Sequence, residues 1–387
     1  MKYKPVKIGV IGCGMISDTY MHNLRDTFYI TDLAACADLV DAKSAKQAEK
    51  YGIRKMTDEE LLADPEIELV ANLTYASAHY EVSKQILAAG KHCYSEKMIA
   101  DNMDEARELY TLAQEKNLML AGAPDTFLGA ALQTARYVLD RGLIGKPLLA
   151  VVSLGRNYQL IKTDADDAYR KYSVVRRGGG LPYDMGGYYL HALFHLFGPV
   201  KRVSGVCKTL DGTRPYLNPR HTLFNEPFDT DTENFLCGTL EFASGLTATI
   251  ALTSDTPDGE HGFTVYGTEG TLYVPDPNEF GNPVYYRRGG QRFEFPLCFP
   301  YSASSRGIGI ADMAWALRTG RPPRLSPLLA MHALEVVKGI VTAGNTGTYQ
   351  NMEITFPRPA PLPSGWNGNG SEERNLFLYN DGETVVE

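Results

Sequence analysis

The sequence predicts an α/β domain with a doubly wound parallel sheet, followed by an α+β domain with a large, open, mainly antiparallel sheet. Apolar runs of strand length alternate with helical patterns through the first third of the chain, which is typical of parallel βαβ units. Further along, short apolar runs are separated by tight turns, which is typical of antiparallel hairpins. The length of 387 residues also favours two domains, because it is long for a single core.

The first domain, expected over residues 1–124, begins with an apolar strand. Residues 6–11 (VKIGVI) lead into a Gly-rich turn that opens a helix within 12–26, and a second strand is predicted at 30–37. The alternation then continues with predicted helices at 43–51 and 58–63, a strand at 68–73, a helix at 78–89, a strand at 91–95, a helix at 103–116 and a strand at 118–122.

The second domain, expected over residues 125–356, contains the hairpin signals. Turn residues at 243–245 (ASG) and 268–270 (TEG) each join two apolar runs. Strands are predicted at 147–155, 200–209, 234–243, 246–253, 262–267 and 270–274, with helices at 129–142, 184–197, 308–319 and 327–343. The remainder, 357–387, is rich in Pro, Gly and Asn and is expected to be an extended C-terminal arm.

Composition restricts the class of partner. The net charge is -8 and no Lys/Arg run is present, which argues against nucleic acid or an anionic membrane and favours a small molecule. The six cysteines lack close spacing and are expected to be reduced. Without a leader-like segment or an uninterrupted 18-residue apolar stretch, the chain is expected to be cytoplasmic. An open sheet and a long arm predict a homodimer or homotetramer.

A Gly-rich motif, GVIGCGMIS, lies between the first strand and the first helix. Gly12 suits the tight turn and Gly14 the close approach of a pyrophosphate, while Ser17 stands where a third glycine or alanine is usual. The helix that follows offers amide groups and a dipole that attract an anion. Met15 and Ile16 belong to the same turn and are expected to contact the cofactor. The pattern predicts a Rossmann domain that binds a dinucleotide.

Asp38, directly after the second predicted strand, indicates which dinucleotide is bound. A carboxylate at this position accepts hydrogen bonds from the adenosine ribose hydroxyls and repels a 2′-phosphate. NAD is therefore expected, although Lys43 lies close enough in sequence to leave NADP possible.

A second informative stretch is GGGLPYDMGGYYLH at residues 178–191, which joins three glycines to Asp184 and Tyr188. Residues four apart lie on one helix face, so a helix that begins near Asp184 would direct both side chains toward one pocket. Two interpretations are open. The two residues form a proton-handling pair, or they are an N-capping Asp and a buried Tyr after a Gly-rich connection.

His191 and His195, in the same predicted helix, have the HxxxH spacing of a metal site. No third ligand is evident nearby, and a hydride cofactor does not need a metal. We therefore expect no metal, and histidines that are either packed in the core or directed toward a substrate.

Taken together, these motifs resemble the Gfo/Idh/MocA oxidoreductase family over about residues 5–350. The resemblance rests on GVIGCGMIS, on Thr74 with His79 after the strand at 68–73, on AAGKHCYSEKM at 88–98, on GLIGKP at 142–147 and on GGGLPYDMGGYYL at 178–190. It implies that Thr74, Tyr75, His79, Glu96 and Lys97 lie at the cofactor.

The same resemblance implies roles in the chemistry. The family usually has Glu-Lys-Pro where this chain has Glu96-Lys97-Met98, and its Lys meets both the nicotinamide and the substrate. Asp184 matches the family's Asp, whereas Tyr188 replaces the more usual His, as in the branch that includes glucose-fructose oxidoreductase and dihydrodiol dehydrogenase. A phenol can relay a proton if a nearby ammonium, such as that of Lys97, stabilises phenolate. Either Tyr188 or Lys97 is therefore expected to take the hydroxyl proton.

Other polar residues are candidates for the substrate site. His191 is a substitute base or a ligand for a sugar hydroxyl. Asp125 and Phe127 lie at the predicted domain junction, and Arg156, Asn157 and Tyr158 follow the first strand of the second domain. These residues either meet sugar hydroxyls or form a turn and an exposed strand end.

The resemblance implies an NAD-dependent enzyme that transfers hydride to or from a secondary hydroxyl or carbonyl of a pyranose, glycoside or related polyol. Two alternatives stay open at this point. Tightly bound NAD could oxidise a glycoside transiently and take part in redox-neutral cleavage, or the chain could be a non-catalytic sugar or nucleotide sensor.

Overall fold

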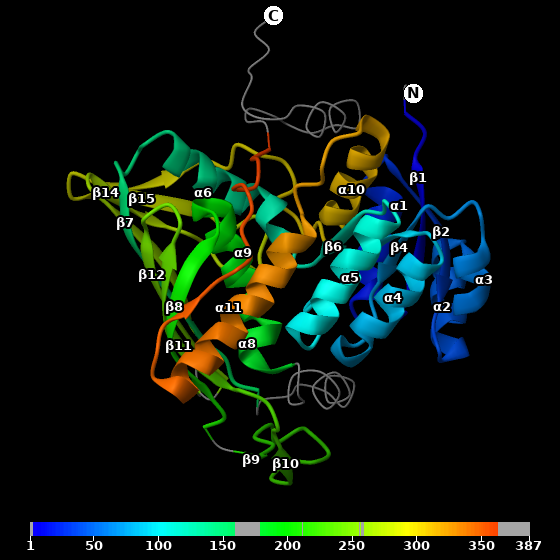
Figure 1. Cartoon of the computed structure of the whole chain (residues 1–387), viewed down its shortest axis with the longest axis horizontal. Helices are drawn as coiled ribbons and strands as arrows, with labels where there is room; N and C mark the ends of the chain where they lie inside the picture. Colours follow the sequence, from blue (N-terminus) through cyan, green and yellow to red (C-terminus); the bar gives the residue numbers. More distant parts are fainter. Residues whose placement is uncertain (1–2, 159–178, 211, 255, 257–258, 363–387) are drawn as a thin grey trace, which may run out of the picture.

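Two sheets, each with its own helices, lie side by side in the computed structural model (Figure 1). The structure describes residues 3–158, 179–210, 212–254, 256 and 259–362. Gly178 of the glycine run and residues 363–387 of the expected arm lie outside these residues.

The first sheet is parallel throughout and has the strand order β3-β2-β1-β4-β5-β6. The order reverses between β1 and β4, and dinucleotides bind at such a switch point, at the carboxyl ends of the strands. This confirms the predicted Rossmann domain. Its strands are β1 (Val6–Ile11), β2 (Thr31–Ala37), β3 (Arg54–Lys55), β4 (Leu69–Asn72), β5 (His92–Ser95) and β6 (Leu120–Gly122), and its helices are α1 (Ser17–Asp26), α2 (Asp41–Tyr51), α3 (Asp58–Ala63), α4 (His79–Ala88) and α5 (Met103–Glu115).

The second sheet has the order β16-β15-β14-β13-β7-β12-β11-β8-β17 among the described residues. β7 and β12 pair in parallel, and the other neighbours are antiparallel. The expected large, mainly antiparallel sheet is therefore confirmed. Its strands are β7 (Pro147–Gly155), β8 (Val200–Lys208), β11 (Phe235–Phe242), β12 (Thr247–Thr253), β13 (His261–Gly267), β14 (Gly270–Tyr273), β15 (Val284–Arg288), β16 (Gln291–Phe295) and β17 (Gln350–Asn351), and β9 (Thr213–Pro215) pairs with β10 (Pro227–Asp229) outside it.

Helices cover one face of this sheet and leave the other exposed (Figure 1). In β7, for example, Ala150, Val152 and Leu154 are buried whereas Val151 is exposed. This alternation is the period-2 pattern of a half-buried strand. The covering helices are α6 (Ala130–Asp140), α8 (Gly180–Asp184), α9 (Gly186–Phe197) and α11 (Pro327–Thr346).

Two of these helices are apolar almost all round because they lie in the core. Every residue of α9 is buried, as expected for a helix without a polar face. α11 is long and apolar enough to cross a membrane by length and composition, but most of it is buried inside the protein, against β8 and α9.

Several parts of the second domain differ from the sequence prediction, among them the short strands β9, β10 and β17, which were not predicted. The helix expected over 184–197 is interrupted: Asp184 ends α8, and α9 begins at Gly186. The strands β15 and β16 were not predicted at all. They are joined by Gly289 and Gly290, both at positive φ, which is the backbone that a two-residue hairpin turn requires.

Helix α10 (Ile308–Thr319) returns from the second domain to the first (Figure 1). Trp315 is fully buried and meets the rings of Tyr3 and Tyr29 edge-on, at 5.7 Å and 5.4 Å between centroids. Arg318 forms an ion pair with Glu68, at 2.7 Å. Residues from both ends of the chain therefore complete the packing of the first domain.

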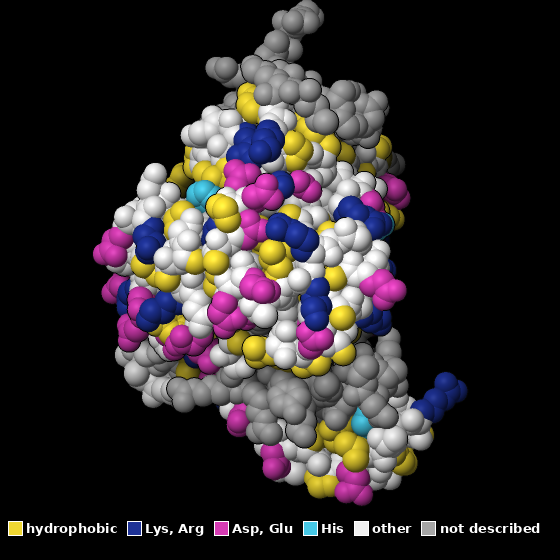
Figure 2. Space-filling view, turned by 90° about the vertical axis from the view of Figure 1, so that its right-hand side faces the viewer, with side chains coloured by type: hydrophobic (Ala, Val, Ile, Leu, Met, Phe, Trp, Pro, Cys, Tyr) yellow, Lys and Arg dark blue, Asp and Glu magenta, His cyan; other side chains and the backbone are white. Residues whose placement is uncertain are grey.

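One face of the first domain shows how its charges are distributed. Figure 2 shows acidic and basic side chains interspersed over the face that carries α2 and α3. Such a mixed face does not have the concentrated positive charge that nucleic-acid binding needs. The six cysteines, all within the described residues, are unpaired, in line with the expected reduced state.

Candidate active site

The Gly-rich loop lies between β1 and α1, at the switch point of the first sheet. Gly12 has φ +100°, and a Cβ there would lie 2.7 Å from the backbone oxygen of Leu73, so only glycine fits. At Gly14 a Cβ would meet no atom within 4 Å, so its surface is open beside the N-terminus of α1. Ile16 precedes that helix, and the Met15 side chain is exposed. This loop fits a pyrophosphate, because backbone and helix amides can approach it closely.

Asp38 follows β2 at the same edge of the sheet. Its two carboxylate oxygens accept hydrogen bonds from the backbone N–H groups of Cys13, at 2.7 Å, and Val40, at 2.8 Å. These contacts fix the carboxylate beside the Gly-rich loop and leave further lone pairs for ribose hydroxyls. The residues of the first domain therefore fit NAD.

The loop after β4 is tied to the turn after β5 by His79. The ring nitrogens of this buried histidine lie 2.7 Å from the carbonyl oxygen of Met98 and 3.0 Å from that of Thr74. The Thr74 hydroxyl donates to Asn72 at 2.6 Å. Tyr75 is partly exposed at the same strand end. His79 thus positions the backbone at this edge rather than presenting its own ring to a ligand.

Glu96 and Lys97 follow β5 directly, and the peptide bond between Lys97 and Met98 is cis. Glu96 is buried and accepts a hydrogen bond of 2.6 Å from the hydroxyl of Tyr20. Burial acts to raise the pKa of Glu96, but Lys97 and Tyr20 outweigh it and lower that pKa. Glu96 is consequently an anion, and its Oε2 accepts a hydrogen bond of 3.1 Å from the backbone N–H of Lys97.

Lys97 meets the second domain at Asp184. The Lys97 Nζ lies 3.0 Å from Asp184 Oδ1, and both side chains are only slightly exposed. The hydroxyl of Tyr158 donates to the other oxygen, Asp184 Oδ2, at 2.7 Å. The same Lys97 Nζ lies 5.2 Å from the centroid of the Tyr188 ring. Residues from both domains therefore converge on one cluster.

The prediction that one helix carries both Asp184 and Tyr188 is wrong, although both side chains do lie at one site. Asp184 and Tyr188 do not share a helix, because α8 ends at Asp184 and Tyr188 belongs to α9. Both still reach Lys97. Gly180, before them, is required for steric reasons: it has φ +77°, and a Cβ there would lie 2.4 Å from the carbonyl oxygen of Glu233.

Tyr188 is a buried phenol between two cations in this cluster. Burial raises the pKa of this phenol, while Lys97 and Arg306 act in the opposite direction. The guanidinium of Arg306 lies 5.5 Å from the ring centroid. Within the described residues, the Tyr188 hydroxyl makes no hydrogen bond, so it is available to a substrate hydroxyl.

The structure does not bring His191 to this cluster. Its ring lies among Phe127 and Phe194, its Nδ1 lies 2.8 Å from the carbonyl oxygen of Gly187, and its Nε2 is buried without a partner. Burial lowers the pKa of His191 to about 4. The imidazole is therefore neutral near pH 7, and the described contacts are those of a packed histidine.

Asp125 and Phe127 are also core residues. Each is 1% exposed, which leaves no surface for a sugar hydroxyl. Asp125 Oδ2 accepts hydrogen bonds from the backbone N–H groups of Gly307 and Gly309, at 2.8 Å and 3.1 Å. The role expected for both residues as substrate ligands is not supported, because their side chains shape the domain junction from inside.

Arg156 and Asn157 lie at the end of β7, as expected, and are partly exposed. Arg156 is 3.8 Å from Asp276, and its Nε is buried without a hydrogen-bond partner. Tyr158, next in the chain, is the residue that reaches Asp184.

Sequence reasoning missed Tyr20 and Arg306 as members of the site, and it named Tyr158 beside Arg156 and Asn157 as a candidate for sugar hydroxyls without predicting its contact with Asp184. Tyr158 is the third polar residue after a predicted strand, and nothing in that position indicates Asp184 as its partner. Tyr20 lies in α1 at a position whose spacing is typical of the core. Arg306 precedes α10, far from the other site residues in sequence. No cluster of three or more metal-binding side chains occurs in the part of the chain that the structure describes.

The fold and the site define a dinucleotide-binding oxidoreductase. Residues 6–122 match the family description "Oxidoreductase family, NAD-binding Rossmann fold", and residues 132–273 match the "GFO/IDH/MocA C-terminal domain". The chain therefore belongs to the Gfo/Idh/MocA oxidoreductase family and binds NAD through its Rossmann domain.

Individual oxidoreductases are also similar to this chain in sequence or in fold. The chain is 30% identical to inositol 2-dehydrogenase/D-chiro-inositol 3-dehydrogenase of Lactiplantibacillus plantarum, over 37% of this chain and 42% of that protein. It is 26% identical to D-xylose dehydrogenase of Paenarthrobacter nicotinovorans, over 45% of each. These matches span less than half of either relative. The structure of aldose-aldose oxidoreductase from Caulobacter crescentus superposes with a TM-score of 0.75 at 20% identity, covering 90% of this chain and 100% of that one, which shows the shared fold.

Proposed function

We propose that this protein is an NAD(H)-dependent dehydrogenase or reductase that acts on a secondary CH–OH group of a pyranose, glycoside or related polyol. The observation that carries the proposal is the contact of Lys97 with both Asp184 and the Tyr188 ring at the carboxyl edge of the first sheet. The inositol and xylose dehydrogenases among its relatives support a polyhydroxylated substrate.

NAD, when bound, supplies the hydride acceptor or donor at this edge. Gly12, Gly14, Met15 and Ile16 would line its pyrophosphate, and Asp38 would accept hydrogen bonds from its adenosine ribose. Asp38 also favours NAD over NADP, because its carboxylate, held by the N–H groups of Cys13 and Val40, would repel a 2′-phosphate.

Tyr188 is the proposed proton carrier. When a carbinol carbon is oxidised, a C–H bond breaks, a C=O bond forms and the hydroxyl proton must leave. The phenolate oxygen of Tyr188 takes that proton, and Lys97 stabilises the phenolate. Asp184 and Tyr158 hold the Lys97 ammonium in place. Reduction of a carbonyl runs through the same groups in reverse.

The test is a screen of sugars, inositols and glycosides, with NADH formation measured by absorbance and product release by chromatography. Stoichiometric NADH with a polyol supports the proposal. Release of an aglycone without NADH would replace it with redox-neutral glycoside cleavage. Firm NAD binding without turnover of any compound would indicate a sensor.

We further propose a cytoplasmic homo-oligomer that buries the exposed face of the second sheet. Val151, Val206 and Tyr266 are 37%, 45% and 44% exposed on this face, and exposed apolar residues spread over one sheet face favour association. Analytical ultracentrifugation of the full chain checks this, with Val206→Asp expected to shift the protein toward monomer.

A further inference from the structure

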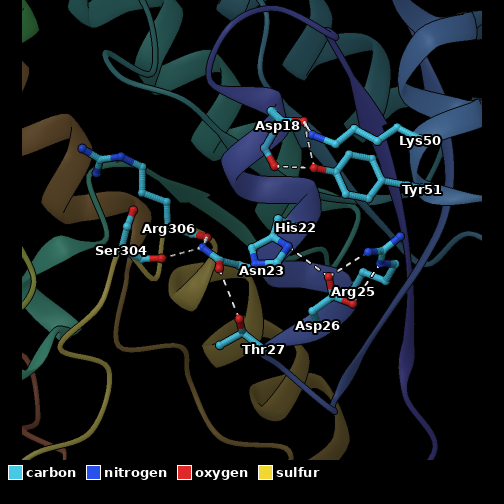
Figure 3. A network of polar contacts seen from close by, with 10 residues as sticks. All are labelled: Asp18, His22, Asn23, Arg25, Asp26, Thr27, Lys50, Tyr51, Ser304 and Arg306. Atoms are coloured by element: carbon cyan, nitrogen blue, oxygen red, sulfur yellow. Dashed lines mark hydrogen bonds and ion pairs between the residues drawn. The ribbon is translucent and has the colours of Figure 1, made fainter.

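Arg306 is a cation whose place beside Tyr188 is fixed from two sides. Asn23 of α1 donates from Nδ2 to the backbone oxygens of Ser304, at 3.0 Å, and Arg306, at 2.8 Å. Asp125 accepts hydrogen bonds from the next backbone amides, those of Gly307 and Gly309. Figure 3 shows the Arg306 side chain extending away from Asn23 and α1.

The guanidinium of Arg306 makes one hydrogen bond to a side chain and no ion pair among the described residues. Arg306 Nη2 donates to Asn278 at 2.6 Å, and no carboxylate among the described residues forms an ion pair with it. Its Cζ lies 5.5 Å from the Tyr188 ring centroid and 6.0 Å from that of Phe280. Burial of a charge without an ion pair is costly, so a partly buried guanidinium needs other favourable contacts, and stacking on an aromatic face is one of them.

Two cations therefore contact one phenol. Lys97 approaches the Tyr188 ring at 5.2 Å and Arg306 at 5.5 Å. Glu96 and Asp184 oppose them with negative charge, and Tyr94 is a nearby phenol. Because Asp184 is ion-paired with Lys97, much of the charge of that ammonium is balanced. Arg306 forms no such ion pair among the described residues, although the carboxylates of Glu96 and Asp125 lie near enough to act on it electrostatically.

We propose that Arg306 is a positioning residue that stabilises the proton-accepting phenolate form of Tyr188 in the reaction proposed above. This inference rests on the proposed function. The effect of Arg306 on the titration of Tyr188 can nevertheless be measured without turnover. Arg306 acts through Tyr188, and Asn23 and Asp125 act through Arg306.

The test labels the tyrosines with ¹³C at Cζ in the full chain and follows the Tyr188 resonance, assigned by its loss in Tyr188→Phe, as a function of pH. In Arg306→Gln the resonance should titrate roughly one pH unit or more higher than in the parent, as expected for removing a charge about 5 Å away. Arg306→Lys should restore most of the shift. Asn23→Ala, which releases the loop without changing charge, should shift the resonance in the same direction by less.

Arg292→Gln is the matched control, because Arg292 also covers a tyrosine ring, that of Tyr285 at 4.2 Å, but at the edge strand β16. It should leave Tyr188 unchanged, and circular dichroism checks that each variant is folded. An identical titration of Tyr188 in the parent and in Arg306→Gln, or no titration in either, overturns the proposal.

The two proposals can fail separately. If Tyr188 shifts as expected but no sugar or polyol yields NADH, the role of Arg306 stands and the proposed reaction falls. If a polyol is oxidised and Arg306→Gln raises only the KM for acidic sugars, without moving the Tyr188 titration or the pH profile of kcat/KM, Arg306 binds a substrate carboxylate and the inference is wrong.

Discussion

Tyr158 donates a 2.7 Å hydrogen bond to the oxygen of Asp184 that Lys97 does not use. The carboxylate is therefore held at both oxygens, by a phenol at the end of β7 and by an ammonium at the end of β5. This arrangement fixes the Lys97 Nζ between the two domains, within reach of the Tyr188 ring.

Replacing Tyr188 by Phe should lower kcat by roughly 10²- to 10⁴-fold, because it removes the group that we propose takes the substrate proton. The affinity for NAD, measured by quenching of protein fluorescence, should stay nearly unchanged. Lys97→Ala should have a similar effect on kcat. Tyr137→Phe, in α6, serves as the control and should retain parental activity. Parental turnover in both Tyr188→Phe and Lys97→Ala would refute the assignment.

Tyr158 and Asp184 should behave as one unit in a double-mutant cycle. Tyr158→Phe and Asp184→Asn each loosen the hold on Lys97, so each should lower kcat, with the larger loss in Asp184→Asn because it also removes the counter-charge. Since both act on the same ammonium, the double variant should be less impaired than the product of the two effects. Strictly additive losses in activation free energy would show that Tyr158 acts independently of Asp184.

Asp38→Ala should weaken NAD binding by roughly ten- to a hundredfold, the range expected for losing hydrogen bonds to a charged acceptor. It should also narrow the preference for NAD over NADP, because the repulsion of a 2′-phosphate disappears. Isothermal titration with both dinucleotides measures this. Asp41→Ala removes an exposed carboxylate three residues away that pairs with Lys55, and its affinity should match the parent. Equal weakening by both variants would point to a general charge effect.

Asp312 should be a major contributor to stability. Its fully buried carboxylate pairs with Arg321, at 2.6 Å, and Arg324, at 3.0 Å. Asp312→Ala removes a buried counter-charge from two buried guanidinium groups, so it should lower the free energy of unfolding by about 3–5 kcal/mol in urea. Glu66→Ala, which breaks an exposed pair with Lys7, should cost at most about 1 kcal/mol.

The effect of Asp312 should depend on pH in a defined direction. Burial acts to raise the pKa of Asp312, but the two guanidinium groups outweigh it and hold that pKa below its usual value. A folded-state pKa below the unfolded one, which is about 3.9, means that the stabilisation is present above the unfolded value and is lost as the pH falls toward the folded one. The stability gap between the parent and Asp312→Ala should therefore narrow below about pH 4. A gap that widens in acid would contradict this sign.

The local features of the cofactor site could be predicted from the sequence because neighbouring residues determine them. The loop from Gly12 to Gly14 and the position of Asp38 follow from one strand-turn-helix-strand unit, and the structure shows both where expected. Lys97 and Asp184 are 87 residues apart, and only the family resemblance connected them before the structure did.

The rest of the site depends on contacts that sequence spacing does not reveal. Arg306 reaches the site because Asn23, 283 residues earlier, holds its carbonyl group. His191 could not be assigned from helical spacing, because α9 is apolar on every side and no polar face marks the pocket. The β15–β16 hairpin, by contrast, had a usable signal in Gly289-Gly290.

The packing of Trp315 against Tyr3 and Tyr29 has a consequence for how the protein is made. The aromatic surface of the first domain emerges from the ribosome early, but its cover in α10 (Ile308–Thr319 of 387 residues) is synthesised much later. At typical translation rates the interval is on the order of tens of seconds. During synthesis this surface is exposed to solvent and to chaperones, so the nascent chain should be most vulnerable to aggregation before α10 appears.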